Sequence, residues 1–284
     1  WRQTPATVAG FVSRGWQSAL ADDHGARVFT SLEDMLPHVD AVDVCTPTNL
    51  HLEQTRLAAA AGKHVVCEKP IARSVADAQA MLDACDNAGV QLLIAHVLRY
   101  FPDYARAHGE ATRGALGAIR EIQLMRAGSV PSKPADNWFA DMAVSGGPML
   151  DLMIHDFDYA RWVAGDVARV SALARGTLDD HAFVTLEHKN GAVSHIEGGW
   201  YLPPGAFRTR LEVRGTAGVV SASSDNSASS TDETPDVPRV QAAGADPYAL
   251  QAQEFYAALA DNLPPRVSAR DGIAALRISL AAIE

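Results

Sequence analysis

The first hundred residues alternate short apolar runs with segments of helical periodicity. The apolar runs predict strands at 8–12, 41–45, 64–67 and 90–95, and helices are predicted at 50–61 and 75–88. Gly62 and Gly89 follow these helices and suit the left-handed turn that ends one. Ser74, with Asp77 three residues later, predicts a capping box. This alternation predicts a parallel sheet with right-handed crossovers.

The second half of the chain carries longer runs in which apolar and polar residues alternate. They predict strands at 121–126, 167–175, 182–187, 192–200, 208–214 and 219–222. The turn sequence HKNG at 188–191 predicts a hairpin, so the sheet is expected to be largely antiparallel. Helices are predicted at 148–163, 248–262 and 269–284, and a loop or insertion at 223–247. We therefore expect two domains, 1–117 and 118–284.

Composition narrows the class of protein. The 284 residues are 48% hydrophobic, enough for two cores, and the net charge of −10 disfavours nucleic acid or an anionic membrane as the main partner. Three cysteines with no CxxC pattern form no complete disulfide framework, which favours a reducing cytoplasm. No apolar stretch is long enough to span a bilayer.

The predicted helix 148–163 carries a row of polar and aromatic residues. Asp151, His155, Asp158 and Trp162 recur at intervals of four, three and four, so they are expected to share one face. A carboxylate one turn before a histidine can orient the imidazole or bind a substrate hydroxyl. The alternative is an ordinary surface pair. No second histidine lies at ligand spacing, so no metal site is predicted.

The segment CEKPIARS (67–74) places Lys69 directly after a predicted strand. In parallel sheets, ligands bind outside the carboxyl ends of the strands. Pro70 locks its own φ and restricts Lys69 to extended conformations. Lys69 is therefore either aimed at a ligand crevice or a solvated lysine paired with Glu68.

Two stretches resemble a known family. VDAVDVCTPTNLHLEQTRLAAAAGKHVVCEKPIA (39–72) and SGGPMLDLMIHDFDYARW (145–162) are similar to the Gfo/Idh/MocA oxidoreductases, in order and over nearly the whole chain. The resemblance implies an α/β protein with a Rossmann-type parallel sheet that binds NAD(P). It also implies an α+β domain with a large, mostly antiparallel open sheet that often forms a subunit interface.

The resemblance also assigns site residues. Lys69, Asp151 and His155 fall on the family's catalytic positions. The cofactor-contacting loops correspond to Thr46, Pro47, Asn49, His51, Glu68 and Lys69. His96, Arg99 and Trp138 fall in segments that approach the nicotinamide end.

The chain departs from the family pattern in two places. It contains no GxGxxG turn, so either that segment lies upstream of Trp1 or the chain does not bind a dinucleotide in the usual way. Ser13 and Arg14 stand where an NAD-preferring enzyme usually has an acidic residue. A hydroxyl and a guanidinium suit a 2′-phosphate, so NADP is favoured over NAD, unless Arg14 is merely solvated.

The resemblance implies hydride transfer between NAD(P) and the hydroxyl or carbonyl carbon of a sugar, inositol or related polyol. His155 would carry the proton, Lys69 would hydrogen-bond the reacting oxygen, and Asp151 would hold His155 or a neighbouring hydroxyl. One alternative is a non-catalytic binding or regulatory protein on the same scaffold. Another is a sugar-acid or dihydrodiol enzyme of the same family. The alternating strands predict a homodimer or homotetramer built through the sheet.

Overall fold

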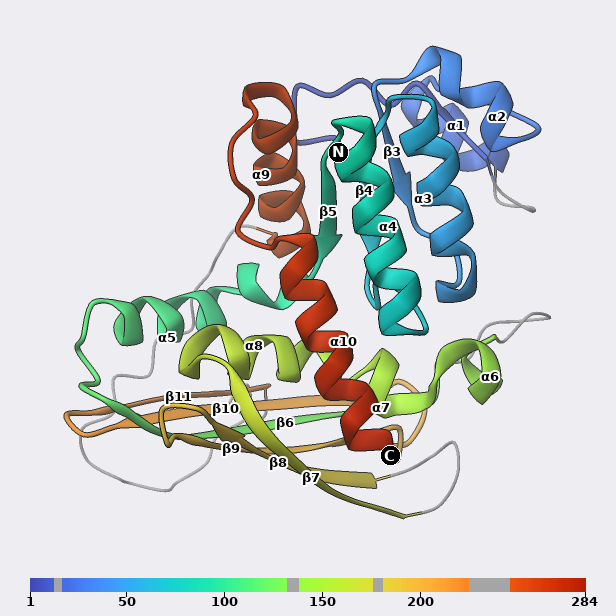
Figure 1. The fold of residues 1–284 in the computed structure, drawn as a ribbon. Coiled ribbons are helices and arrows are strands. Elements are labelled where there is room, and N and C mark those ends of the chain that lie inside the picture. The colour runs from blue at the N-terminus through green and yellow to red at the C-terminus, as the bar shows by residue number, and fades with distance from the viewer. Residues whose placement is uncertain (13–16, 132–137, 176–180, 225–245) are drawn as a thin grey trace. The chain divides into compact units, whose positions relative to one another are not determined.

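The computed structural model describes residues 1–12, 17–131, 138–175, 181–224 and 246–284. The chain divides into two compact units. The first consists of residues 1–96 and 248–273, and the second of residues 97–247 and 274–284. Each unit is described by itself (Figure 1).

The first unit contains a three-stranded parallel sheet in the order β3-β4-β5. Its strands are β3 (Ala41–Val44), β4 (His64–Glu68) and β5 (Leu92–Ala95). Two further short strands, β1 (Gly10–Phe11) and β2 (Arg27–Val28), pair in parallel. The helices are α1 (Gln17–His24), α2 (Leu32–Met35), η1 (Leu36–His38), η2 (Thr48–Leu50), α3 (His51–Ala60), α4 (Val75–Ala88) and α9 (Pro247–Asp261). The predicted Rossmann-type parallel sheet is confirmed.

Helix α4 illustrates why the first unit follows its sequence closely. The Ser74 hydroxyl accepts a hydrogen bond from the Asp77 N–H at 3.0 Å, as the capping prediction requires. The helix ends at Gly89, whose φ of 68° is in the left-handed region. Ser74 therefore fixes the point at which the segment that carries Lys69 enters a helix.

Helix α9 belongs to the first unit, although it lies far along the chain. Phe255 and Ala258 pack with Val66, Leu93 and Ala95 of the parallel sheet. The division therefore differs from the single cut after residue 117. The first unit ends at His96 and regains residues 248–273, because the apolar face of α9 is buried against β4 and β5.

The second unit contains a six-stranded sheet in the order β11-β10-β6-β9-β8-β7. Its strands are β6 (Ile119–Gly128), β7 (Val167–Arg175), β8 (His181–His188), β9 (Val193–Gly199), β10 (Phe207–Gly215) and β11 (Val219–Ser223). Neighbouring strands are antiparallel except β6 and β9, which are parallel. The prediction of a largely antiparallel sheet is confirmed.

Helices cover one face of this sheet. The described helices of this unit are η3 (Val97–Tyr100), α5 (Pro102–Thr112), η4 (Trp138–Ala140), α6 (Met142–Ser145), α7 (Gly147–Asp151), α8 (Ile154–Ala164) and the C-terminal part of α10 (Ala269–Ile283). Leu124, Val184 and Leu211 of the sheet form one buried cluster with Phe157 of α8 and Ile278 of α10. No described helix lies on the opposite face, which we call the outer face (Figure 1). Among the described helices, none has the length and apolar character needed to cross a membrane.

The prediction of one continuous helix over 148–163 is wrong, because α7 ends at Asp151 and α8 begins at Ile154. Between them, the N–H groups of Leu152 and Met153 both donate to the Pro148 carbonyl, at 2.9 and 2.8 Å. The second bond spans five residues, so one extra residue is inserted in the turn. Periodicity alone does not show such an insertion, and the argument that Asp151 and His155 share a regular helix face therefore fails.

Candidate active site

The predicted site residues of the first unit follow the carboxyl ends of its three parallel strands. Those ends lie at one edge of the sheet, since Val44 pairs with Cys67 and Cys67 with Ile94. Thr46, Pro47 and Asn49 follow β3, Glu68 and Lys69 lie at the end of β4, and His96 follows β5. The structure thus brings this set together at the edge where ligands bind in open α/β sheets.

Lys69 is half-buried at this edge. Its backbone N–H donates to the carboxylate of Glu68 at 3.2 Å, so that carboxylate helps fix the backbone of the lysine. The Lys69–Pro70 peptide bond is cis, and Pro70 is buried. The Glu68 contact on one side and the burial of Pro70 on the other hold the backbone around Lys69, while its side chain remains partly accessible.

His51, the first residue of α3, is buried, with 1% of its surface exposed. Its Nδ1 lies 3.0 Å from the Pro70 carbonyl and 3.2 Å from that of Ile71, and its Nε2 lies 2.9 Å from the Thr46 carbonyl. Burial lowers the pKa of His51 below its ordinary value of 6.5, and the carbonyl contacts oppose this shift. The ring therefore faces the loops after β3 and β4 from inside the unit.

His96 lies deeper than a ligand-lining role would suggest. It is fully buried, and its backbone N–H donates to the Ile94 carbonyl at 2.9 Å. On the loop after β3, the Thr46 hydroxyl donates to Gln54 Oε1 at 2.7 Å, and Asn49 is exposed. Among the predicted residues of this edge, Asn49 is thus exposed, and the half-buried ones are Thr46, Pro47, Glu68 and Lys69.

The donor set at this edge fits part of a dinucleotide. A carboxylate, a carboxamide and an ammonium suit the hydroxyl and amide groups of a ribose and a nicotinamide. A pyrophosphate would need the glycine-rich turn, which these 284 residues do not contain. Ser13 and Arg14, the basis of the NADP prediction, lie outside the described residues.

The predicted catalytic residues of the second unit flank the turn between α7 and α8. Asp151 is buried, with 7% exposed, and His155 is half-buried in the first turn of α8. The two glycines before Asp151 both have positive φ, 79° at Gly146 and 73° at Gly147. These left-handed conformations favour glycine at both positions, and a Cβ at Gly147 would also lie 2.7 Å from Met142 Sδ.

Two buried arginine–aspartate pairs hold the segment of α8 that carries His155. Arg126 donates to both carboxylate oxygens of Asp156, at 2.7 and 3.1 Å. Arg99 donates to both oxygens of Asp158, at 2.8 and 2.6 Å. Burial works against the charge of Arg126, but Asp156 raises the pKa of its guanidinium above the ordinary value. The pairs tie α8 to β6 and to η3.

Arg99 was predicted to approach the nicotinamide end, and the structure gives its guanidinium another partner. The side chain is 2% exposed, and its guanidinium is used in the pair with Asp158. It also lies over the ring of Trp162 at 5.1 Å. Asp158 and Trp162, which the spacing placed on one face with Asp151 and His155, therefore pack with Arg99.

Trp138, also predicted near the nicotinamide, belongs to an aromatic cluster. Its ring stacks on Phe139 with centroids 3.9 Å apart, and Phe139 meets Trp200 edge to face at 6.3 Å. Within the described ranges, no three His, Cys, Asp or Glu side chains gather as a metal site would require.

The sequence interpretation missed the bracing roles of His51, Asp156 and Asp158. The signal available for the aspartates was HDFD (155–158), in which two carboxylates lie two residues apart in a helix segment rich in apolar residues. A charge on a buried helix needs a partner, but the sequence does not identify the arginine. For His51 there was no local signal, because its partners are backbone carbonyls up to 20 residues away.

Comparisons with known proteins match the chain in two parts. Residues 2–96 match the family model described as "Oxidoreductase family, NAD-binding Rossmann fold", and residues 104–221 match "GFO/IDH/MocA C-terminal domain". Myo-inositol 2-dehydrogenase of Thermotoga maritima is 31% identical over 94% of this chain and 81% of that protein. The uncharacterized oxidoreductase YrbE of Bacillus subtilis is 30% identical over 92% and 81%. The crystal structure of GenD2 from gentamicin A biosynthesis, in complex with NAD, has a TM-score of 0.84 at 28% identity and covers 97% of this chain and 85% of that one.

Proposed function

The chain belongs to the Gfo/Idh/MocA family of NAD(P)-dependent dehydrogenases and reductases, and we propose that it acts on a hydroxyl or carbonyl carbon of a sugar, inositol or related polyol. The Thermotoga maritima relative is named for an inositol, which supports a polyhydroxylated substrate. The observation that carries the proposal is the position of Lys69. It is half-buried and held on both sides, at the carboxyl edge of a parallel sheet.

We assign the proton chemistry to three side chains. The bound nicotinamide supplies or accepts the hydride. The Lys69 ammonium hydrogen-bonds the reacting oxygen and stabilises the charge that develops on it. His155 takes the hydroxyl proton during oxidation and returns it during reduction, since imidazole exchanges protons near neutral pH. Asp151 orients His155 or binds a neighbouring substrate hydroxyl.

We assign cofactor contacts to the edge residues and to Ser13 and Arg14. Glu68, Asn49 and the backbone of the loop after β3 bind the ribose and the amide of the nicotinamide. Ser13 and Arg14 bind the 2′-phosphate of NADP, which makes NADP the preferred cofactor over NAD. Trp138, through its aromatic cluster, borders the nicotinamide end. His51 and His96 contribute by shaping the loops, since both rings are buried.

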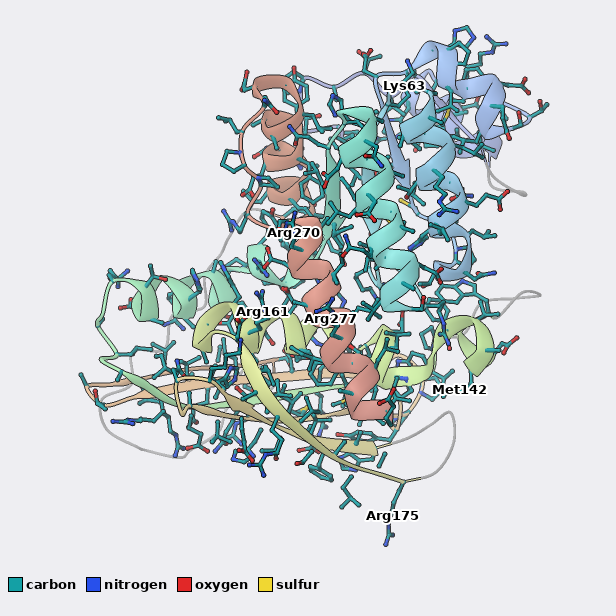
Figure 2. All side chains as sticks on the ribbon, viewed as in Figure 1. Lys63, Met142, Arg161, Arg175, Arg270 and Arg277 are labelled. Atoms are coloured by element: carbon teal, nitrogen blue, oxygen red, sulfur yellow. The ribbon has the colours of Figure 1, made fainter. Side chains whose placement is uncertain are left out.

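Replacing Lys69 with methionine tests the proposal. Methionine has a similar shape but cannot donate, so turnover is expected to fall by about 10²–10³, as for the loss of a preorganised donor to a developing oxyanion. Lys63→Met is a matched control, because Lys63 precedes the other end of the same strand β4 (Figure 2). Normal turnover in the Lys69→Met protein, or an equal loss in Lys63→Met, would contradict the assignment.

A substrate panel tests the reaction itself. Sugars and cyclitols are each mixed with NAD or NADP, and the absorbance of the reduced nicotinamide is followed. The proposal predicts turnover with at least one polyol and faster turnover with NADP. Cofactor binding by calorimetry without turnover of any polyol or sugar acid would favour the non-catalytic alternative.

We further propose a homodimer or homotetramer built through the outer face of the six-stranded sheet. On this face Leu173 and Phe183 are cross-strand partners, and 70% and 49% of their surfaces are exposed. Near them is a shallow hollow of about 260 Å³, lined in part by Met125 and Arg210. Arg175 points away from the helices on the same side (Figure 2). Two large apolar side chains exposed side by side, on a sheet face that no described helix covers, favour a second copy as its cover. A monomer by light scattering at micromolar concentration would contradict this.

A further inference from the structure

The hydrogen bonds of the His51 ring join the loop after β3 to the loop after β4. It is buried, so it reaches both loops from inside the first unit. The loops carry the residues to which we assigned cofactor and substrate contacts. A group that fixes both loops also fixes those residues without touching a ligand.

The contacts of the ring indicate which nitrogen carries its hydrogen. All three partners are carbonyl oxygens, which only accept. Nδ1 faces two of them, at 3.0 and 3.2 Å, whereas Nε2 faces one, at 2.9 Å. A neutral imidazole has a single N–H, and at Nδ1 that hydrogen is shared between Pro70 and Ile71. The tautomer with hydrogen on Nδ1 therefore satisfies more of the surrounding acceptors.

We propose that His51 is a positioning residue for Lys69, and that it acts by donating from Nδ1 to the carbonyls of Pro70 and Ile71. These carbonyls follow Lys69 directly in the chain, so the bond sets the direction in which the loop leaves β4. Together with the bond from the Lys69 N–H to Glu68, it holds the lysine from both sides. This inference rests on the role proposed above for Lys69.

Two substitutions separate the nitrogens. In His51→Asn the amide nitrogen lies approximately where Nδ1 was, and in His51→Gln approximately where Nε2 was. His51→Asn should keep the donor to Pro70 and Ile71, and turnover with NADP and the best polyol of the panel should stay within about twofold. His51→Gln should lose the donor to Pro70 and Ile71, and turnover should fall by about tenfold. A tenfold change corresponds to about the free energy of one hydrogen bond. NADP affinity, measured by calorimetry, should change less than turnover in His51→Gln.

His188 provides the matched control. It is also a buried histidine, 3% exposed, and its Nδ1 and Nε2 contact the Gly165 carbonyl and the Ser194 hydroxyl at 2.7 and 2.8 Å. It belongs to the second unit and to none of the assigned site residues. His188→Asn and His188→Gln should lower the melting temperature and leave turnover within twofold. Equal turnover in His51→Asn and His51→Gln would overturn the inference. An equally large difference in turnover between His188→Asn and His188→Gln would also overturn it.

Nitrogen-15 NMR of the histidine-labelled wild-type protein provides a test that needs no variant to fold and no substrate. At neutral pH the inference requires hydrogen on Nδ1 of His51, and hydrogen on Nε2 alone would overturn it. The Lys69→Met result separates this inference from the proposed function. Full turnover in Lys69→Met contradicts the role of the lysine. Reduced turnover in Lys69→Met, together with equal turnover in His51→Asn and His51→Gln, contradicts the positioning role of His51 alone.

Discussion

The two units of the molecule bury different kinds of polar group. Among the described residues, the buried polar side chains of the first unit include no carboxylate, guanidinium or ammonium group: they are Thr48, His51, Thr55, His96 and Gln251. The second unit buries six charged side chains: Arg99, Arg126, Asp151, Asp156, Asp158 and Glu212. Both units hold a side chain assigned to catalysis, but they do so with interactions of different strength.

The difference follows from the element that has to be held. A loop after a strand leaves carbonyl oxygens without partners in the sheet, and a single imidazole inside the unit can bind several of them. A helix satisfies its own backbone, so only its side chains can fix it to its neighbours. His51 therefore contacts the backbone that follows Lys69, whereas Asp156 and Asp158 fix the helix that carries His155.

The largest expected effect comes from leaving one charge of a buried pair without its partner. Arg126→Met leaves the fully buried Asp156 without its guanidinium, and we expect the free energy of unfolding to fall by about 3–5 kcal/mol. Urea denaturation measures this. Arg169→Met is the control, because Arg169 and Glu187 are 71% and 44% exposed and such pairs contribute about 0–1 kcal/mol.

The double variant Arg126→Met/Asp156→Leu sharpens this prediction. Replacing both charges with apolar groups removes the uncompensated carboxylate, so most of the lost stability should return. If the double variant is as unstable as Arg126→Met, packing of the Arg126 stem is responsible instead of its charge. If Arg126→Met is as stable as Arg169→Met, the contrast drawn between the two units is wrong.

The next prediction concerns Arg14 in the first unit, whose charge we assign to cofactor binding and not to a pair with another side chain. Arg14→Ala should weaken NADP binding by about 1.5–3 kcal/mol, the contribution of a hydrogen bond to a charged group, and leave NAD binding nearly unchanged. Calorimetry with each cofactor measures the difference. Equal affinities for NAD and NADP in the wild-type protein would show that Arg14 does not select the cofactor.

The sequence predicted elements well where local signals were sufficient. Strand 167–175 and helix 75–88 have the predicted limits, and the Ser74 cap forms as expected. Lys69 could be placed at the carboxyl edge because the end of its strand is a local feature and the alternation of strands and helices indicates a parallel sheet. The same reasoning extended 148–163 as one helix, because an inserted residue leaves no trace in the periodicity of apolar positions.

Most of the interactions that could not be predicted join distant parts of the chain. Arg99 and Asp158 are 59 residues apart, and Arg126 and Asp156 are 30 apart. Helix α9 returns to pack on strands more than 150 residues earlier. His51 binds carbonyls, which every residue possesses, so no residue type identifies its partners. The positions assigned to chemistry could thus be proposed from the sequence, but not the groups that hold them.

The smallest expected effect concerns the protonation of two buried histidines, His51 in the first unit and His188 in the second. Burial lowers the pKa of His51 and of His188, and their carbonyl contacts oppose it. Between the folded pKa and about 6.5, the unfolded chain binds more protons than the folded one, so stability falls as pH decreases through this window. Each histidine contributes at most about 1.4 kcal/mol per pH unit. Urea denaturation at pH 7.5 and 5.5 should show this loss in the wild type and a smaller loss in both His51→Asn and His188→Gln. A reduction in only one variant would mean that acid acts on one unit, and an unchanged loss in both would assign the pH dependence to carboxylates.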